Sequence, residues 1–241
     1  MDKIMLNNGT EMPLLGFGVF QITDEKICEE SVSAALNTGY RMIDTAACYG
    51  NERAVGNAIQ KSGIPREEIF ISSKVWIQDA GYEATKKSFE KTLKNLQTDY
   101  LDLILSHDIV PAINQIELHP FSQQKELRSV MEKYDIQPMA WAPFAEGQNN
   151  IFNNKILAGI GENYGKTPAQ VILRWLRQSN ITAIPKSVHE ERIRQNYDVD
   201  DFELSEEDMK KVEQMDTGKS LILDVPNLNE VYRLHDIRFE Q

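Results

Sequence analysis

The chain opens with two short apolar runs around an Asn-Gly pair and then alternates between apolar segments and segments with helical spacing. Residues 4–6 and 12–15 flank Asn8-Gly9, and an Asn-Gly pair supplies the positive φ angles that a tight hairpin turn needs. The run at 101–106 is almost unbroken in apolar residues, as expected for a strand covered on both faces. Beyond the hairpin we expect strands over residues 41–44, 69–75, 101–106, 112–117, 139–141 and 181–185.

Segments with helical spacing separate these strands. Cys28, Val32, Ala35 and Leu36 share one helical face, and Gly39 stands where that helix would end. Thr167 and Pro168, with a glutamine three residues after the threonine, form a helix start with a hydroxyl cap and proline at the first helical position. Further inward stripes are predicted at Phe89, Leu93 and Leu96, at Leu127, Val130, Met131 and Tyr134, at Ala169, Ile172, Leu173 and Leu176, and, after a Ser205 cap, at Met209 and Val212.

Unbroken alternation of strand and helix predicts a parallel sheet with helices outside, either closed as a barrel or open as a doubly wound sheet. The hairpin start disfavours the open form, and Gly16-Phe17-Gly18 lacks the third glycine of a dinucleotide-binding turn. Gly159-Ile160-Gly161 is interpreted as punctuation between a helix and a loop. Although 241 residues could also form two small domains, we expect one α/β barrel domain over residues 1–241.

Composition narrows the possible partners. With 26 Lys and Arg against 37 Asp and Glu, the net charge of −11 disfavours nucleic acid and anionic membranes. No apolar run reaches the length of a spanning helix, and the first residues lead directly into foldable sequence, so we expect a cytoplasmic protein. Cys28 and Cys48 lack metal-ligand spacing and the four histidines form no paired motif, so neither a metal nor a disulfide is expected.

Polar side chains gather where the predicted strands end. Asp44 ends one strand, with Tyr49 five residues later, Lys74 ends the next, and His107 follows the one after. The active sites of α/β barrels lie at the carboxyl ends of the strands. An acid, a phenol, an amine and an imidazole at successive strand ends would therefore point into one cavity.

This set of groups suits the reduction of a carbonyl, in which a hydride reaches carbon while an acid protonates oxygen. Tyr49 is the candidate acid, and we expect the Lys74 ammonium to lower its pKa from the usual value of about 10. Asp44 would hold Lys74 charged and oriented, and His107 would hydrogen-bond the substrate oxygen. Taken alone, Lys74 is interpreted as a surface lysine and His107 as a satisfied edge histidine, but the four together favour a functional site.

Several stretches of sequence carry a resemblance to a known family. They are Gly39-Tyr40-Arg41-Met42-Ile43-Asp44-Thr45-Ala46, Tyr49-Gly50-Asn51-Glu52, Ile71-Ser72-Ser73-Lys74-Val75-Trp76 and Asn114-Gln115-Ile116-Glu117-Leu118-His119-Pro120. These stretches resemble the aldo-keto reductases, and among them the bacterial branch typified by 2,5-diketo-gluconate reductases. The resemblance runs from end to end of the chain. It implies a (β/α)8 barrel that reduces a small aldehyde or ketone with NADPH.

The resemblance also implies a role for each matching residue. Asp44, Tyr49, Lys74 and His107 match the family's catalytic tetrad, with Tyr49 as proton donor. The segment Ile184-Pro185-Lys186-Ser187-Val188, followed by Arg192, resembles the stretch in which the lysine, serine and arginine hold the adenosine 2'-phosphate. The other implied contacts are Gln115 and Trp141 to the nicotinamide, Ala142, Pro143 and Phe144 to the pyrophosphate, Gln195 and Asn196 to adenine, and Phe20 and Trp76 at the substrate mouth.

The chain departs from the family pattern after His107. Family members place a loop, a helix, a fifth strand and another helix before the strand that carries Asn114 and Gln115, whereas here only a short link follows His107. Seven strands are countable where eight are expected, so one unit of about 30 residues is predicted to be missing. This gap supports a rival hypothesis, an NADP-binding protein without turnover or a gene remnant. The particular carbonyl substrate, the activity of a shortened barrel and the oligomeric state stay open.

Overall fold

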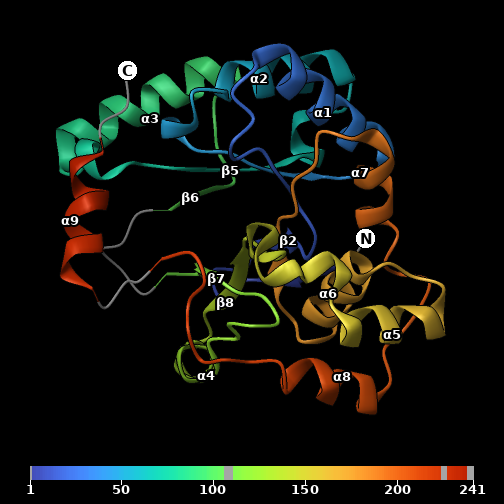
Figure 1. The fold of residues 1–241 in the computed structure, drawn as a ribbon. Helices are drawn as coiled ribbons and strands as arrows, with labels where there is room; N and C mark the ends of the chain where they lie inside the picture. Colours follow the sequence, from blue (N-terminus) through green and yellow to red (C-terminus); the bar gives the residue numbers. More distant parts are fainter. Residues whose placement is uncertain (1, 106–110, 224–226, 238–241) are drawn as a thin grey trace. The chain divides into compact units, whose positions relative to one another are not determined.

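The chain divides into two compact units whose sequences interleave. The computed structural model describes residues 2–105, 111–223 and 227–237 (Figure 1). Unit 1 comprises Met1–Gly16, Asp108–Pro185 and Arg194–Leu223, and unit 2 comprises Phe17–His107, Lys186–Ile193 and Asp224–Gln241. The expected single domain over residues 1–241 stays a prediction.

Unit 2 is built on a four-stranded parallel sheet with the order β3-β4-β5-β6. Its strands are β3 (Phe17–Gly18), β4 (Met42–Asp44), β5 (Phe70–Lys74) and β6 (Leu103–Leu105). The helices α1 (Glu25–Thr38), α2 (Glu52–Ser62) and α3 (Tyr82–Leu96) alternate with them, and α9 (Leu228–Asp236) lies near the end of the chain. Short 3-10 turns are η1 (Ala47–Tyr49), η2 (Arg66–Glu68) and η3 (Ile77–Asp79).

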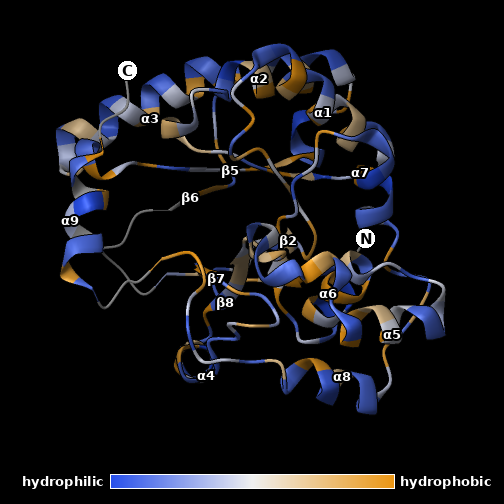
Figure 2. Cartoon of the chain, viewed as in Figure 1, coloured by the Kyte–Doolittle hydropathy of each residue, from blue (hydrophilic) through white to orange (hydrophobic). Residues whose placement is uncertain are grey.

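Helix α1 forms as its sequence predicts. The Asp24 carboxylate accepts a hydrogen bond from the backbone N–H of Ile27 at 2.8 Å, which caps the first turn. Gly39 ends the helix with a φ of 121°, a conformation open to glycine. The predicted stripe at Cys28, Val32, Ala35 and Leu36 is buried, while hydrophilic residues cover much of α1, α2 and α3 (Figure 2).

Unit 1 combines the predicted hairpin with a three-stranded parallel sheet. The hairpin strands β1 (Lys3–Met5) and β2 (Glu11–Pro13) pair antiparallel, with Ile4 opposite Met12. The sheet order is β7-β8-β9, formed by β7 (Ile113–Glu117), β8 (Gln137–Trp141) and β9 (Thr182–Ala183). The helices are α4 (Lys125–Lys133), α5 (Lys155–Tyr164), α6 (Pro168–Gln178) and α8 (Glu206–Glu213), with η4 (Ala145–Asn153) after β8.

Helix α7 (Glu190–Tyr197) contains the boundary between the two units, which falls after Ile193. The two parallel sheets together hold seven strands within the described ranges, and six of them correspond to the strand ranges predicted beyond the hairpin, whereas β3 does not. The caps at Thr167 and Ser205 also form as predicted, the first as a full capping box. Within the described residues, no helix is both long and apolar enough to cross a membrane.

Some predicted bounds and faces are wrong. Strands β5 and β9 are shorter than predicted, β6 begins two residues later than predicted, at Leu103, and β8 begins two residues earlier, at Gln137. On α4 only Met131 of the predicted stripe is buried, whereas Leu127, Val130 and Tyr134 are 37%, 51% and 52% exposed. Ala169 and Met209 are half-buried instead of buried. Helical spacing therefore predicted the positions of these helices better than it predicted which of their residues are buried.

Gly159 and Gly161 lie inside α5, so their interpretation as punctuation between a helix and a loop is wrong. A Cβ atom on Gly161 would lie 2.2 Å from the Lys166 carbonyl oxygen, while a Cβ atom on Gly159 would meet no atom within 4 Å. The Lys166 N–H donates to the Gly161 carbonyl at 2.9 Å, which holds this backbone close. Gly161 therefore permits the tight turn after α5.

These two glycines form a matched pair for a stability test. We expect Gly161→Ala to lower the free energy of unfolding by about 1–3 kcal/mol, since the added methyl group overpacks against backbone. Gly159→Ala should raise it by about 0.5–1 kcal/mol, because alanine loses less backbone entropy in an open helical position. Urea denaturation of both variants measures the two signs, and equal effects would contradict the proposed role of the Lys166 carbonyl.

Glu117, the last residue of β7, anchors the segment after α8. Its carboxylate accepts hydrogen bonds from the Ser220 hydroxyl at 2.5 Å and from the Leu221 N–H at 2.9 Å. His119, fully buried, accepts from the Phe121 N–H at Nδ1, so its Nε2–H donates to Glu117 at 3.0 Å. Burial opposes ionisation of Glu117, but the hydrogen bonds from His119, Ser220 and Leu221 outweigh it, and the pKa of this carboxyl lies below its usual value.

Glu117→Gln should therefore destabilise the fold in a pH-dependent manner. A carboxyl with a lowered folded-state pKa stabilises the fold above its unfolded pKa of about 4.3 and loses that contribution as the pH falls through the folded-state pKa. At pH 7 we expect a loss of about 1–3 kcal/mol, shrinking toward pH 3. Urea denaturation across this pH range measures it, with the exposed Glu126→Gln as control. A loss that does not change with pH would exclude the ionised carboxylate as its source.

Candidate active site

The ends of β4 and β5 bring Asp44 and Lys74 into direct contact. Asp44 is the last residue of β4 and Lys74 the last of β5, and the parallel register places Asp44 opposite Ser72. The Lys74 ammonium donates to both carboxylate oxygens of Asp44, at 2.8 and 2.7 Å, and to the Thr45 carbonyl at 2.8 Å. These three acceptors use all three of its N–H bonds. Ser72 adds a hydroxyl that donates to Asp44 at 2.5 Å.

Tyr49 lies beside this ion pair at the end of η1. The Lys74 Nζ atom is 5.2 Å from the centroid of the Tyr49 ring, within the range of a cation–π contact. The ring of Phe20 packs against Tyr49 with 4.9 Å between centroids. The Tyr49 hydroxyl makes no hydrogen bond to any residue that the structure describes. Three of the four predicted catalytic side chains thus come together, with a hydroxyl free to meet a substrate oxygen.

The expectation of a lowered Tyr49 pKa is wrong. Burial raises the pKa of Tyr49 far above its usual value, and the negative charge of Asp44 raises it further. The main physical reason is desolvation, which penalises the phenolate, and the Asp44 carboxylate adds to it by offsetting the field of the Lys74 ammonium. Tyr49 therefore holds its proton at neutral pH, as a proton donor must before it reacts.

Cys48 lies in η1, next to Tyr49, and Trp76 lies in the loop after β5. Burial raises the pKa of the Cys48 thiol to about 11, despite the nearby Lys74 ammonium, so the neutral form dominates at neutral pH, in keeping with the interpretation of Cys48 as a packing residue. The Trp76 indole N–H donates to the Ile237 carbonyl at 3.3 Å. Phe20 is 47% exposed, so it can contact a substrate. His107 lies outside the described residues, and its predicted role stays a prediction.

Asn51, which the sequence shows only as part of the stretch Tyr49-Gly50-Asn51-Glu52, connects two loops of the candidate site. Its buried amide donates to the carbonyls of Val19 and Ile22, at 2.9 and 3.1 Å, and accepts from the Thr45 hydroxyl at 3.1 Å. It thereby ties the loop that carries Phe20 to the loop that carries Tyr49. Asparagine can do this because its side chain both donates and accepts, a property that no spacing pattern indicates.

In unit 1, Gln115 and Trp141 lie on adjacent parallel strands. Gln115 pairs in register with Met139, and its amide donates to the Met139 sulfur at 2.9 Å. Trp141 is the last residue of β8, opposite Glu117 at the end of β7. Both predicted nicotinamide contacts thus belong to the strands expected to carry them, with Trp141 at a carboxyl end.

The loop after β8 adopts an unusual backbone. Ala142 and Ala145 have φ angles of 48° in the left-handed region, and the Ala145 N–H donates to the Ala142 carbonyl at 2.8 Å. A left-handed residue that is not glycine costs roughly 1–2 kcal/mol, and such strain is concentrated at functional sites. Pro143 is buried, and the ring of Phe144 packs on Phe152 at 5.5 Å. The loop predicted to pass over the pyrophosphate is therefore fixed in a strained conformation.

The three residues predicted to hold the 2'-phosphate belong to unit 2, where Lys186 and Ser187 precede α7 and Arg192 lies within it. Lys186 and Arg192 are exposed, and neither forms an ion pair within the described residues. The Ser187 hydroxyl is buried and accepts from the His189 N–H at 3.1 Å, so it shapes the turn. Val188 is 42% exposed. Gln195 and Asn196 lie on the part of α7 that belongs to unit 1, and Asn196 is buried.

Comparisons with known proteins identify the family to which this chain is similar. The sequence model of the aldo/keto reductase family matches residues 14–112 and 108–217. A glyoxal reductase of Bacillus subtilis is 42% identical over 89% of this chain and 92% of its own length. The methylglyoxal reductase DkgA of Escherichia coli is 35% identical over 90% of this chain and 94% of its own.

The glyoxal reductase alignment covers 257 positions, more than the 241 residues of the whole chain, so it contains positions that this chain lacks. The comparison does not place those positions after His107. The missing barrel unit stays a prediction.

Solved structures give the same result. An aldo-keto reductase from a Medee basin deep-sea metagenome library, MGS-M4, is 38% identical with a TM-score of 0.89, covering 93% of this chain and 98% of its own. A variant of Gox0644 solved in complex with NADPH is 31% identical with a TM-score of 0.87, covering 94% of this chain and 97% of its own. The predicted fold class and enzyme class are confirmed, and the chain belongs to the aldo/keto reductase family.

Proposed function

We propose that this chain reduces small aldehydes or ketones to alcohols with NADPH, and that Tyr49 donates the proton. The contact that carries the proposal is the Asp44–Lys74 ion pair, whose ammonium lies 5.2 Å from the Tyr49 ring centroid. A protonated phenol with an open hydroxyl, next to a fixed positive charge, suits a carbonyl oxygen that gains negative charge as it is reduced.

Each side chain would then have one task. The Tyr49 O–H hydrogen-bonds the carbonyl oxygen of the substrate and transfers its proton to that oxygen as hydride adds to the carbon and the C=O double bond becomes a single bond. The Lys74 ammonium, held by Asp44 and by the Thr45 carbonyl, stabilises the phenolate that remains. Phe20, half exposed against the Tyr49 ring, covers the substrate and limits access of water. His107 would orient the same oxygen.

The residues present fit NADPH. When bound, NADPH supplies the hydride. Lys186 and Arg192 are exposed cations without acidic partners among the described residues, in a chain of net charge −11, which suits them to a phosphate. Ser187 would contribute through its backbone more than through its hydroxyl, which already bonds His189. In unit 1, Gln115 and Trp141 would hold the nicotinamide.

The substrate class follows from the relatives. Two of them are named for the reduction of glyoxal and methylglyoxal, which are small dicarbonyl compounds. We propose small 2-oxoaldehydes as substrates, because a single tyrosine proton donor flanked by one aromatic ring demands little of a substrate beyond an accessible carbonyl group.

The phenol of Tyr49 can be removed without altering the ring. Tyr49→Phe should lower kcat for methylglyoxal at least about 100-fold, since general acid catalysis contributes at this level, while NADPH binding stays within about twofold. NADPH oxidation at 340 nm and a fluorescence titration measure the two quantities. Turnover by the phenylalanine variant within tenfold of the parent would refute Tyr49 as the donor.

Recognition of the 2'-phosphate makes a separate prediction. Lys186→Ala with Arg192→Ala should weaken NADPH binding about 10- to 100-fold, in line with the loss of charge-assisted hydrogen bonds. The affinity for NADH, which lacks that phosphate, should fall less than about twofold. The exposed Lys26→Ala serves as control in the same fluorescence titrations. If the affinities for NADPH and NADH fell equally, Lys186 and Arg192 would not be the residues that recognise the phosphate.

The rival is an NADPH-binding protein without turnover, which the predicted loss of a barrel unit favours. NADPH binding by the unaltered chain, combined with no oxidation on glyoxal or methylglyoxal, would support this rival. Failure to bind NADPH would instead support a gene remnant. Saturable turnover excludes both.

A further inference from the structure

The turn that carries Phe20 has a strained backbone. Residues 19–22 form one tight turn, which the Ile22 N–H closes by donating to the Val19 carbonyl at 3.2 Å. Gln21, next to Phe20, has a φ of 63° in the left-handed region, where residues other than glycine are disfavoured. Strained residues of this kind persist only where the surrounding structure holds them.

Asn51 holds both ends of this turn. It is 1% exposed, and its side-chain nitrogen donates to the Val19 carbonyl at 2.9 Å and to the Ile22 carbonyl at 3.1 Å. The Val19 N–H also donates to the Asp44 carbonyl at 3.1 Å, which joins the start of the turn to the end of β4. The turn is therefore fixed relative to the strand that carries Asp44.

Helix capping does not account for Asn51. It precedes α2, at a position where asparagine commonly caps a helix, but its side chain makes no cap hydrogen bond. The side-chain oxygen instead accepts from the Thr45 hydroxyl at 3.1 Å, and the Thr45 carbonyl accepts from the Lys74 ammonium. The three hydrogen bonds of the Asn51 side chain thus go to the two loops of the candidate site.

The turn presents the Phe20 ring to the proposed proton donor. The rings of Phe20 and Tyr49 lie 4.9 Å apart between centroids, and Phe20 is 47% exposed. A side chain that is half exposed on a turn has little packing of its own to fix it, so the ring position depends on the backbone that carries it. Movement of this turn would displace the Phe20 ring while the hydrogen bonds between Asp44 and Lys74 remain.

We propose that Asn51 is a positioning residue for carbonyl reduction. Its buried amide holds the strained turn that places the Phe20 ring against Tyr49, and it acts on substrate binding and not on proton transfer. The kinetic part of this inference rests on the proposed function. The placement of the Phe20 ring does not, because it is a property of the protein without substrate.

The position of the Phe20 ring can be measured without turnover. In the full-length protein with 13C-labelled Phe and Tyr rings, the parent should show a nuclear Overhauser effect between Phe20 and Tyr49, assigned with Phe20→Ala. Asn51→Ala leaves the two turn carbonyls without their amide donor, and Asn51→Asp sets a carboxylate against them. In both variants the effect should be lost.

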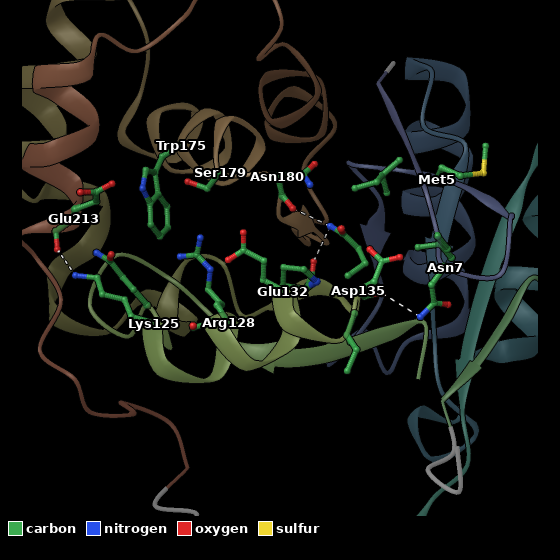
Figure 3. Close-up of a pocket in the computed structure, with 17 residues that line it drawn as sticks. Met5, Asn7, Lys125, Arg128, Glu132, Asp135, Trp175, Ser179, Asn180 and Glu213 are labelled. Atoms are coloured by element: carbon green, nitrogen blue, oxygen red, sulfur yellow. Dashed lines mark hydrogen bonds between the residues drawn. The ribbon is translucent and has the colours of Figure 1, made fainter. Parts of the chain in front are cut away.

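Asn7→Ala is the matched control. The Asn7 side-chain amide also donates to a backbone carbonyl, that of Asp135 at 3.0 Å, but it borders a pocket of unit 1 that none of the proposed catalytic residues lines (Figure 3). The Overhauser effect between Phe20 and Tyr49 should persist in this variant.

Steady-state kinetics show what the positioning does. In Asn51→Ala the KM for methylglyoxal should rise at least about fivefold, while kcat stays within about threefold, because the ion pair and the Tyr49 phenol remain. In a Phe20→Ala background the same substitution should change KM less than about twofold, since the ring that Asn51 positions is gone. An asparagine that only stabilises the fold would have the same effect in both backgrounds.

Several outcomes overturn the proposal. An Overhauser effect that is absent from the parent, or that persists in both Asn51 variants, contradicts it whether or not the chain is active. Equal changes of KM in the two backgrounds also contradict it. A parent that shows the effect but does not oxidise NADPH contradicts the proposed function alone, and loss of the effect in the variants then still supports the role of Asn51.

Hydrogen exchange in the parent decides the matter if both Asn51 variants fail to fold. The side-chain amide protons of Asn51 should exchange at least about 100-fold more slowly than those of the exposed Asn8. Similar exchange rates would contradict the hydrogen bonds that hold the turn.

Discussion

The salt bridge between Asp44 and Lys74 sets the chemistry of the candidate active site. Parallel pairing aligns β4 with β5, so the side chains at their carboxyl ends meet, and the Lys74 ammonium then has all three of its N–H bonds occupied at 2.7–2.8 Å. Because each N–H bond has an acceptor, rotating the ammonium or pairing it with another carboxylate would break existing hydrogen bonds. The charge near the Tyr49 ring is therefore fixed in place before any substrate arrives, which is the condition for electrostatic preorganisation.

Burial, together with the carboxylate of this salt bridge, explains why the Tyr49 phenol keeps its proton. An isolated ammonium would favour the phenolate, but this ammonium carries its own carboxylate, and burial then decides the direction in which the pKa moves. The free phenol is thus a stable acid. The positive charge of Lys74 matters once negative charge develops on the phenol oxygen, because a preoriented cation stabilises a new anion without further reorganisation. Asp44 therefore acts by fixing Lys74 and not by making the resting phenol more acidic.

How much the sequence predicted depended on whether a property is local. The carboxyl ends of β4 and β5 were located to within one residue, since an apolar start followed by a polar residue is a local feature that places Asp44 and Lys74 at these ends. Caps such as Thr167 and Ser205 are likewise set by neighbouring residues. The direction of the Tyr49 pKa, the bonds of Asn51 and the close approach at Gly161 depend on residues distant in sequence or on burial. No pattern along the chain carries that information.

Helix α4 shows that the sequence also does not reveal which apolar side chains other parts of the structure cover. Its apolar stripe has the spacing of a buried face, yet Leu127, Val130 and Tyr134 are exposed and only Met131 is covered. In a barrel each outer helix contacts the strands below it and the helices on either side. An apolar stripe can therefore pack against a neighbouring helix as well as against the sheet. Among the described residues, helix α4 is the first helix after His107, where the sequence predicts that one unit of the family pattern is missing. The loss of that unit would remove one neighbouring helix of α4. The apolar residues of the stripe would then remain in the sequence, but the helix that covered them would be absent.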